Sequence, residues 1–158
     1  MERGAEGTSL YDGAVIIRMW YKTSIVGASA SGALAAAFRL SSRDKQQNPP
    51  YLSMFEQSLT TDQQAKEITG KDLALPLFVS EVRSLVNPDY PDHTLDVCWF
   101  QATILQETES VPDHRPGTEG HCGIIGLLRP SEFPKKRWKW FCVKLADIAF
   151  CNNPRPVP

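Results

Sequence analysis

Long apolar runs are missing from this sequence of 158 residues. A helix that crosses a bilayer needs about 18 or more apolar residues in succession, and the most apolar stretch, 25–38, is interrupted by Gly27, Ser29, Ser31 and Gly32. The first ten residues mix glycine with charge and lack the apolar centre of a secretory signal. These absences predict a protein that has no membrane association and is intracellular, in the cytoplasm.

A strong charge of one sign is also missing. The formal net charge of −1 excludes a strongly basic nucleic-acid binder, although it leaves room for a local basic patch. The composition, 42% hydrophobic and 22% charged, is that of a folded globular chain. We predict a single globular domain over 1–158, with polar termini at about 1–10 and 151–158. A chain of this size buries enough surface to fold without covalent staples.

Paired cysteines are absent as well. Cys98, Cys122, Cys142 and Cys151 form no CxxC motif, and nothing at the N-terminus indicates secretion. Buried free thiols are therefore expected. Two disulfides would be expected only in a secreted chain.

Alternating apolar residues predict two strands near the N-terminus. Residues 14–22 alternate with one fully apolar face, and residues 34–41 repeat this period of two after a loop at 27–32. We expect the two strands to form a long hairpin. Residues 42–50 then turn polar and end in Asn-Pro-Pro, which is typical of a surface connector.

The middle of the sequence carries helix signals. Thr61 and Gln64 have the spacing of a capping box, and Gly70 is placed to end the helix. A second helix is predicted from about Asp72 to Val86, with an apolar face at helical spacing. Because Phe78 and its neighbours are also good sheet residues, the sequence leaves open whether 73–86 is helix or strand.

Three further strands are expected in the second half, at 95–106, at 122–128 and from Arg137 to Phe150. The predicted fold class is therefore α+β, mainly an antiparallel β-sheet with one or two short helices after the first hairpin. If 73–86 is extended, the alternative is an all-β sandwich.

The motif Gly120-His121-Cys122-Gly123 resembles the Gly-x-Cys-Gly nucleophile loop of chymotrypsin-like cysteine proteases. The resemblance implies that Cys122 is the nucleophile of a hydrolase, with backbone N–H groups around it stabilising an oxyanion. Such enzymes place their general-base histidine well before the nucleophile, but no histidine here precedes His93. We therefore predict no catalytic residue and keep a Cys122 hydrolase as an alternative.

No cofactor or metal is predicted. His114, His121 and Cys122, with Cys98 or Cys142, are acceptable zinc ligand types, but they lack the close pairs typical of zinc sites. The glycine-containing loop at 27–32 lacks the lysine of a P-loop.

The strongest candidate binding feature is the run Lys135–Phe141, in which four cations lie beside three aromatic rings. Its candidate binding residues are Lys135, Lys136, Arg137, Lys139 and Phe141. On the predicted strand, Arg137, Lys139 and Phe141 share one face. Trp138, Trp140 and Cys142 share the other, so both indole rings are expected to be buried and Lys139 exposed. Basic strands with exposed rings bind single-stranded nucleic acid. However, since the net charge is −1 and this run holds four positive charges, the rest of the chain carries −5.

The sequence therefore favours a non-catalytic, β-rich module that binds another protein or copies of itself. A single-stranded nucleic-acid-binding protein that uses the 135–141 strand is the alternative.

Overall fold

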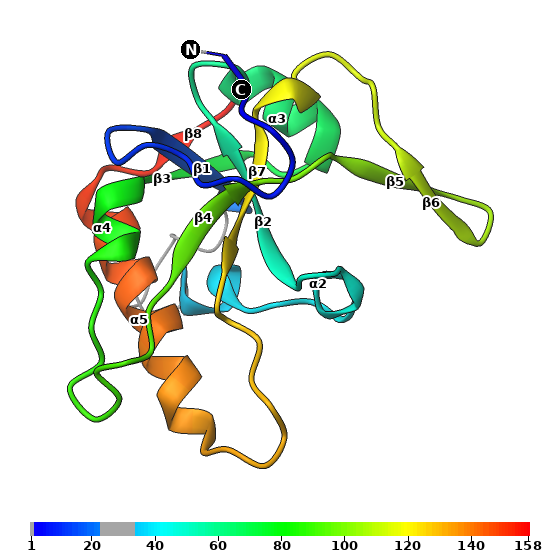
Figure 1. Cartoon of the computed structure of the whole chain (residues 1–158). Coiled ribbons are helices and arrows are strands. Elements are labelled where there is room, and N and C mark those ends of the chain that lie inside the picture. Colours follow the sequence, from blue (N-terminus) through cyan, green and yellow to red (C-terminus); the bar gives the residue numbers. More distant parts are fainter. Residues whose placement is uncertain (1, 23–33) are drawn as a thin grey trace.

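The computed structural model describes residues 2–22 and 34–158. Its main element is a curled six-stranded sheet in which every pairing is antiparallel, in the order β4-β7-β2-β1-β3-β8. A long C-terminal helix packs along one side of the sheet, and a separate two-stranded hairpin projects from the opposite side (Figure 1). The sheet strands are β1 (Val15–Trp20), β2 (Tyr51–Glu56), β3 (Leu73–Phe78), β4 (Asp96–Trp99), β7 (His121–Ile125) and β8 (Arg155–Pro156).

The first strand, β1, forms as predicted, but it lies inside the sheet between β2 and β3. Both of its faces are covered, because Ile16 packs into the main core while Ile17 and Met19 pack in a second cluster with Ala65. Tyr21, which was expected on the apolar face, is 49% exposed. The expectation of a single apolar face therefore understates how deeply this strand is buried.

The predicted strand over 34–41 is wrong. Residues Ala35–Phe38 form a short 3-10 helix, η2, that buries Ala37 and Phe38, so the expected N-terminal hairpin does not form with them. The loop at 27–32 lies outside the described residues. The predicted connector contains helix α2 (Ser42–Gln46), begun by a capping box between Ser41 and Asp44. Three alanines before Phe38 favour a helical turn over a strand.

The capping-box helix is confirmed as α3 (Asp62–Thr69), with Gly70 closing it at a φ of 73°. Residues 73–86, for which the sequence left helix and strand open, contain both a strand and a helix. Residues Leu73–Phe78 form β3, and Val79–Arg83 form helix α4. Pro76 is tolerated in β3 because a proline still supplies a carbonyl acceptor and an extended φ.

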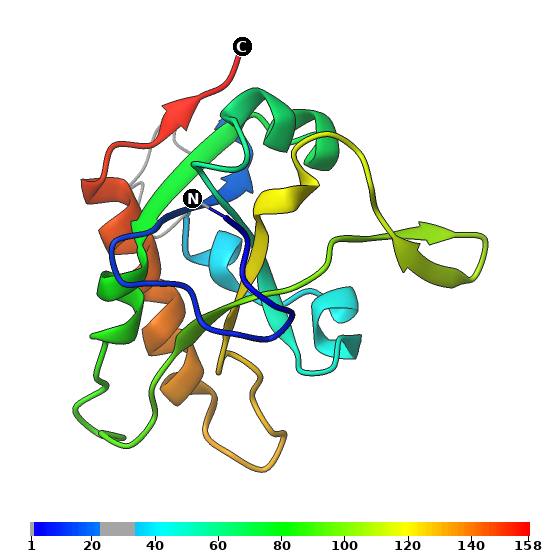
Figure 2. The same cartoon turned by 45° about the horizontal axis from the view of Figure 1, so that its top comes forward.

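The predicted strand at 95–106 is divided into two elements. Its first part is β4, whereas its second part is β5 (Thr103–Gln106), which pairs only with β6 (Glu109–Pro112) in a sheet of two strands. Figures 1 and 2 both show this hairpin extending away from the body of the molecule. The strand expected at 122–128 is β7, preceded by a short 3-10 turn, η3 (Thr118–Gly120).

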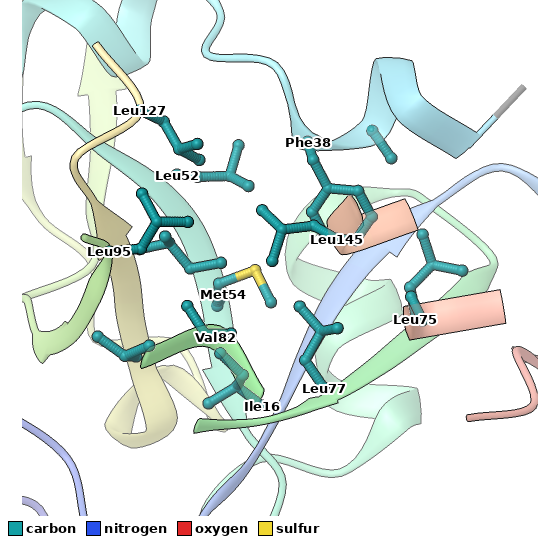
Figure 3. Packing of buried hydrophobic residues seen from close by; sticks show 14 of the residues in the cluster. Ile16, Phe38, Leu52, Met54, Leu75, Leu77, Val82, Leu95, Leu127 and Leu145 are labelled. Carbon is teal, nitrogen blue, oxygen red and sulfur yellow. The ribbon is translucent and has the colours of Figure 1, made fainter. Parts of the chain in front are cut away.

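The predicted strand from Arg137 to Phe150 is wrong, since Lys135–Cys151 form a 17-residue helix, α5. Its buried residues recur at helical spacing, and they contact η2 and the sheet in one core. Phe38, Met54, Leu77 and Leu145 meet there, as Figure 3 shows. Burial of this repeated apolar face outweighs the sheet preference of the aromatic residues.

The N-terminal segment covers the β4 edge of the sheet, and the C-terminal strand β8 forms the other edge. Thr8 and Leu10 exchange backbone hydrogen bonds with β4, and β8 pairs with β3 while Val157 is buried. The fold class is α+β and mainly antiparallel β, as predicted. None of the helices in the described residues combines the length and apolar character that a bilayer span requires.

Candidate functional site: a cationic pocket

The first turns of α5 form one wall of a cavity of about 410 Å³. The other walls come from the segment after η2, from α2 and from the loop that joins β7 to α5. We call this cavity the cationic pocket. Its lining is Arg39, Leu40, Lys45, Leu127, Arg129, Ser131, Lys135, Trp138, Lys139 and Cys142.

Five of the ten lining residues are cationic, and none is acidic. Among the described residues, no ion pair involves Arg39, Lys45, Arg129, Lys135 or Lys139. Asp44 lies in an adjoining cavity that shares Arg39, but its carboxylate accepts the backbone N–H of Ser41 in the α2 cap. The pocket therefore concentrates positive charge without an internal counter-ion.

The start of α5 adds to this positive potential. Its N-cap is Pro134, which supplies no capping side chain, and its first turn holds no acidic residue. Helices usually place carboxylates here, because the free N–H groups and the helix dipole favour negative charge. Lys135 and Lys136 stand in those positions instead. A local rule broken in this way is expected where a site serves binding rather than stability.

Trp138 forms an apolar wall of the pocket and is only 8% exposed. Its buried Nε1–H has no acceptor among the described residues. An unsatisfied buried donor costs about 1–3 kcal/mol, so an oxygen atom seated against this ring would be stabilised. Together with Leu40 and Leu127, the indole makes the pocket suitable for a ligand that has both a charged group and an apolar part.

The structure places the five predicted binding residues in four environments. Lys135 and Lys139 line the pocket, whereas Lys136 is exposed outside its lining. Arg137 donates from Nε to His93 Nδ1 at 2.9 Å and stacks over Tyr90. Phe141 has no exposed surface and belongs to the core. The expected common face of Arg137, Lys139 and Phe141 was wrong because the segment is helical.

Trp138 and Lys139 nevertheless have the burial and exposure predicted for them. Trp138 is buried, Lys139 is exposed, and Trp140 is half-buried against the core. The α5 helix produces this burial pattern, although the prediction assumed a strand. The rings of this segment are therefore largely covered.

A second polar arrangement, which the sequence reasoning missed, joins Ser53 to His121 across the sheet. The Ser53 hydroxyl lies 2.7 Å from His121 Nε2, while His121 Nδ1 lies 2.8 Å from the Phe100 carbonyl oxygen. Because a carbonyl only accepts, Nδ1 carries the proton and Nε2 accepts from the serine. Burial lowers the pKa of His121, so the ring is neutral at pH 7. Only the pairing of β2 with β7 brings these residues together.

Cys122 is fully buried, facing the core on β7. Burial, reinforced by the charge of Glu56, raises the pKa of its thiol well above the ordinary value. His121 points to the opposite face of the strand, toward Ser53. The two central residues of the Gly-His-Cys-Gly motif are therefore separated by the sheet.

All four cysteines are free, and Cys151 is the exposed one. Within residues 2–22 and 34–158, no three His, Cys, Asp or Glu side chains are grouped so that they could hold a metal ion. Comparisons with protein-family models, with curated proteins and with solved structures found no match.

Proposed function

We propose that this chain is a non-catalytic binding domain whose cationic pocket holds an acidic segment of a protein. The observation that carries the proposal is the set of five cations around one cavity, with no carboxylate in its lining and an uncapped helix N-terminus beside it. An anionic group in this position would be stabilised both by the cationic side chains and by the helix dipole.

Two observations favour a protein over single-stranded nucleic acid. Nucleic acid is held by exposed rings that stack on bases, but Trp138 and Phe141 are buried. The positive charge also lies around a compact cavity rather than along a groove that would follow a phosphate backbone. Free buried thiols support an intracellular location for this interaction.

The proposal is tested with a fluorescent oligoglutamate peptide, measured by polarisation against the full chain. The pocket variant carries Lys135→Glu and Lys139→Glu. Its matched control carries Lys22→Glu and Lys144→Glu, which make the same charge change on exposed residues outside the pocket lining and away from the first turn of α5. We expect the pocket variant to weaken binding about tenfold or more and the control about twofold or less.

Equal losses in both variants, or no binding by the unmodified chain, would overturn the proposal. A single-stranded oligouridylate serves as the second probe. If it binds more tightly than the peptide, with a steep salt dependence that the pocket variant removes, the nucleic-acid alternative replaces the proposal.

A further inference from the structure

The β5–β6 hairpin is the part of the described structure that lacks a packing partner of its own. Within the described residues its two strands pair only with each other, and Arg43 of α2 ties its base to the body by donating to the Thr103 carbonyl oxygen. Figure 2 shows the rest of the hairpin extending beyond the body. Isolated two-stranded hairpins are marginally stable in water, so this one would gain from a surface to pack against.

The charge of the hairpin is opposite to that of the pocket. Between Gln101 and Pro112 the only charged residues are Glu107 and Glu109, at the turn and at the start of β6. Both are exposed, and neither forms an ion pair within the described residues. Leu105, close to the turn, is 55% exposed. The tip thus combines two carboxylates with an apolar side chain.

We propose that the β5–β6 tip of one copy of this chain docks in the cationic pocket of a second copy. This inference rests on the proposed function and names the acidic segment. Glu107 and Glu109 face the ring of cations formed by Lys135, Lys139 and their neighbours. Leu105 packs against the apolar part of the pocket, which includes Leu127 and Trp138.

The arrangement is intermolecular because the tip points away from the pocket of its own molecule. The pocket is lined by α2, the β7–α5 loop and the start of α5. In Figures 1 and 2 the hairpin extends outward from the body and away from the start of α5. Tip and pocket are different surfaces, so the contact is head-to-tail. Such contacts build closed rings or open chains, and the smallest closed ring is a dimer in which two copies exchange tips.

The test is sedimentation velocity on the full chain over about two decades of concentration around 10 µM. We expect the unmodified chain to form oligomers that grow with concentration. The tip variant Glu107→Lys with Glu109→Lys and the pocket variant Lys135→Glu with Lys139→Glu should each weaken assembly about tenfold or more. A control variant, Glu2→Lys with Glu67→Lys, makes the charge change of the tip variant on exposed residues elsewhere and should assemble normally.

Mixing the tip variant with the pocket variant gives the sharpest outcome. The acidic tip of the pocket variant fits the intact pocket of the tip variant. The reversed pair, a lysine tip and a pocket that carries two glutamates, is complementary as well. The mixture should therefore recover the assembly that is weakened in each variant alone. A monomeric unmodified chain, or variants that assemble normally, would overturn this inference. Oligoglutamate binding by that monomer would leave the proposed function standing, so the two failures are distinguishable.

Discussion

Two faces of α5 show how differently one helix treats its side chains. Phe141, Leu145 and Ala149 enter the core with no exposed surface. On a neighbouring face, Lys135 and Lys139 line the cationic pocket and form no ion pair with the part of the chain that the structure describes. The first face stabilises the fold, whereas the second keeps a concentration of charge that the folded chain does not neutralise. Substitutions on the two faces should therefore affect different properties.

Phe141→Ala should have the largest effect on stability. The substitution removes a fully buried ring from the contact between α5, η2 and the sheet, and it should lower the free energy of unfolding by about 4 kcal/mol. Urea denaturation followed by circular dichroism measures this. Lys144→Ala, at an exposed position of the same helix, should change the value by about 0.5 kcal/mol or less. Similar losses in both variants would contradict the assignment of the faces.

Thiol reactivity should distinguish the pocket from the end of the helix. Cys142 donates to the Phe38 carbonyl oxygen at 3.2 Å, and burial raises its pKa, while Cys151 is exposed. Ellman's reagent should modify Cys151 roughly a hundredfold faster than Cys142. Cys151→Ser should abolish the fast phase. A fast phase that survives in this variant would show that one of the buried thiols is accessible.

Acid should weaken the attachment of the loop that holds α5. His93 Nε2 donates to the Gly126 carbonyl oxygen and Nδ1 accepts from Arg137, so the folded state holds the neutral ring. Burial, with a contribution from Arg137, lowers the pKa of His93 below its ordinary 6.5. The unfolded chain then binds the proton more readily, and stability present above about pH 6.5 is lost as the pH falls.

Urea denaturation across this range checks the His93 prediction. His93→Gln should flatten part of the pH dependence, and the remainder should come from His121, whose pKa is also lowered by burial. An unchanged pH dependence in His93→Gln would contradict the proposed role of His93.

The smallest effect on stability should come from the pocket itself. Lys135→Glu places a carboxylate in the first turn of α5, where the helix dipole favours it, and relieves the crowding of positive charge. We expect the free energy of unfolding to rise by about 0.5 kcal/mol while oligoglutamate binding weakens. Thermal melting and polarisation measure the two quantities on the same sample. A destabilised variant would indicate that Lys135 supports the fold.

Short sequence patterns correctly predicted the elements whose formation depends on neighbouring residues. The Thr61–Gln64 capping box and Gly70 predicted α3, and the alternation of apolar residues over 14–22 predicted β1. The error at α5 arose because short alternation around Lys139 was preferred to a longer pattern. The buried positions that recur at helical spacing would have indicated the helix, and they are Trp138, Phe141, Cys142, Leu145, Ala146 and Ala149.

The pocket could be predicted only in part. Lys135 and Lys139 were identified from a run of like charges, but Arg39, Lys45 and Arg129 lie in other segments. Folding brings these segments together through contacts of α5 with η2 that no local pattern indicates. The Ser53–His121 hydrogen bond was missed for the same reason, since it depends on the register of two strands distant in the sequence.

The terminal segments that cover the sheet edges have a consequence for aggregation. An uncovered edge strand offers its free N–H and C=O groups to any passing strand. Here the Val157 N–H donates to the Asp72 carbonyl oxygen beside β3, and Pro156 contributes no donor of its own. Removing residues 155–158 would expose the apolar edge at Leu73 and Ala74. The shortened chain, which also loses the buried Val157, should then be prone to form intermolecular sheets.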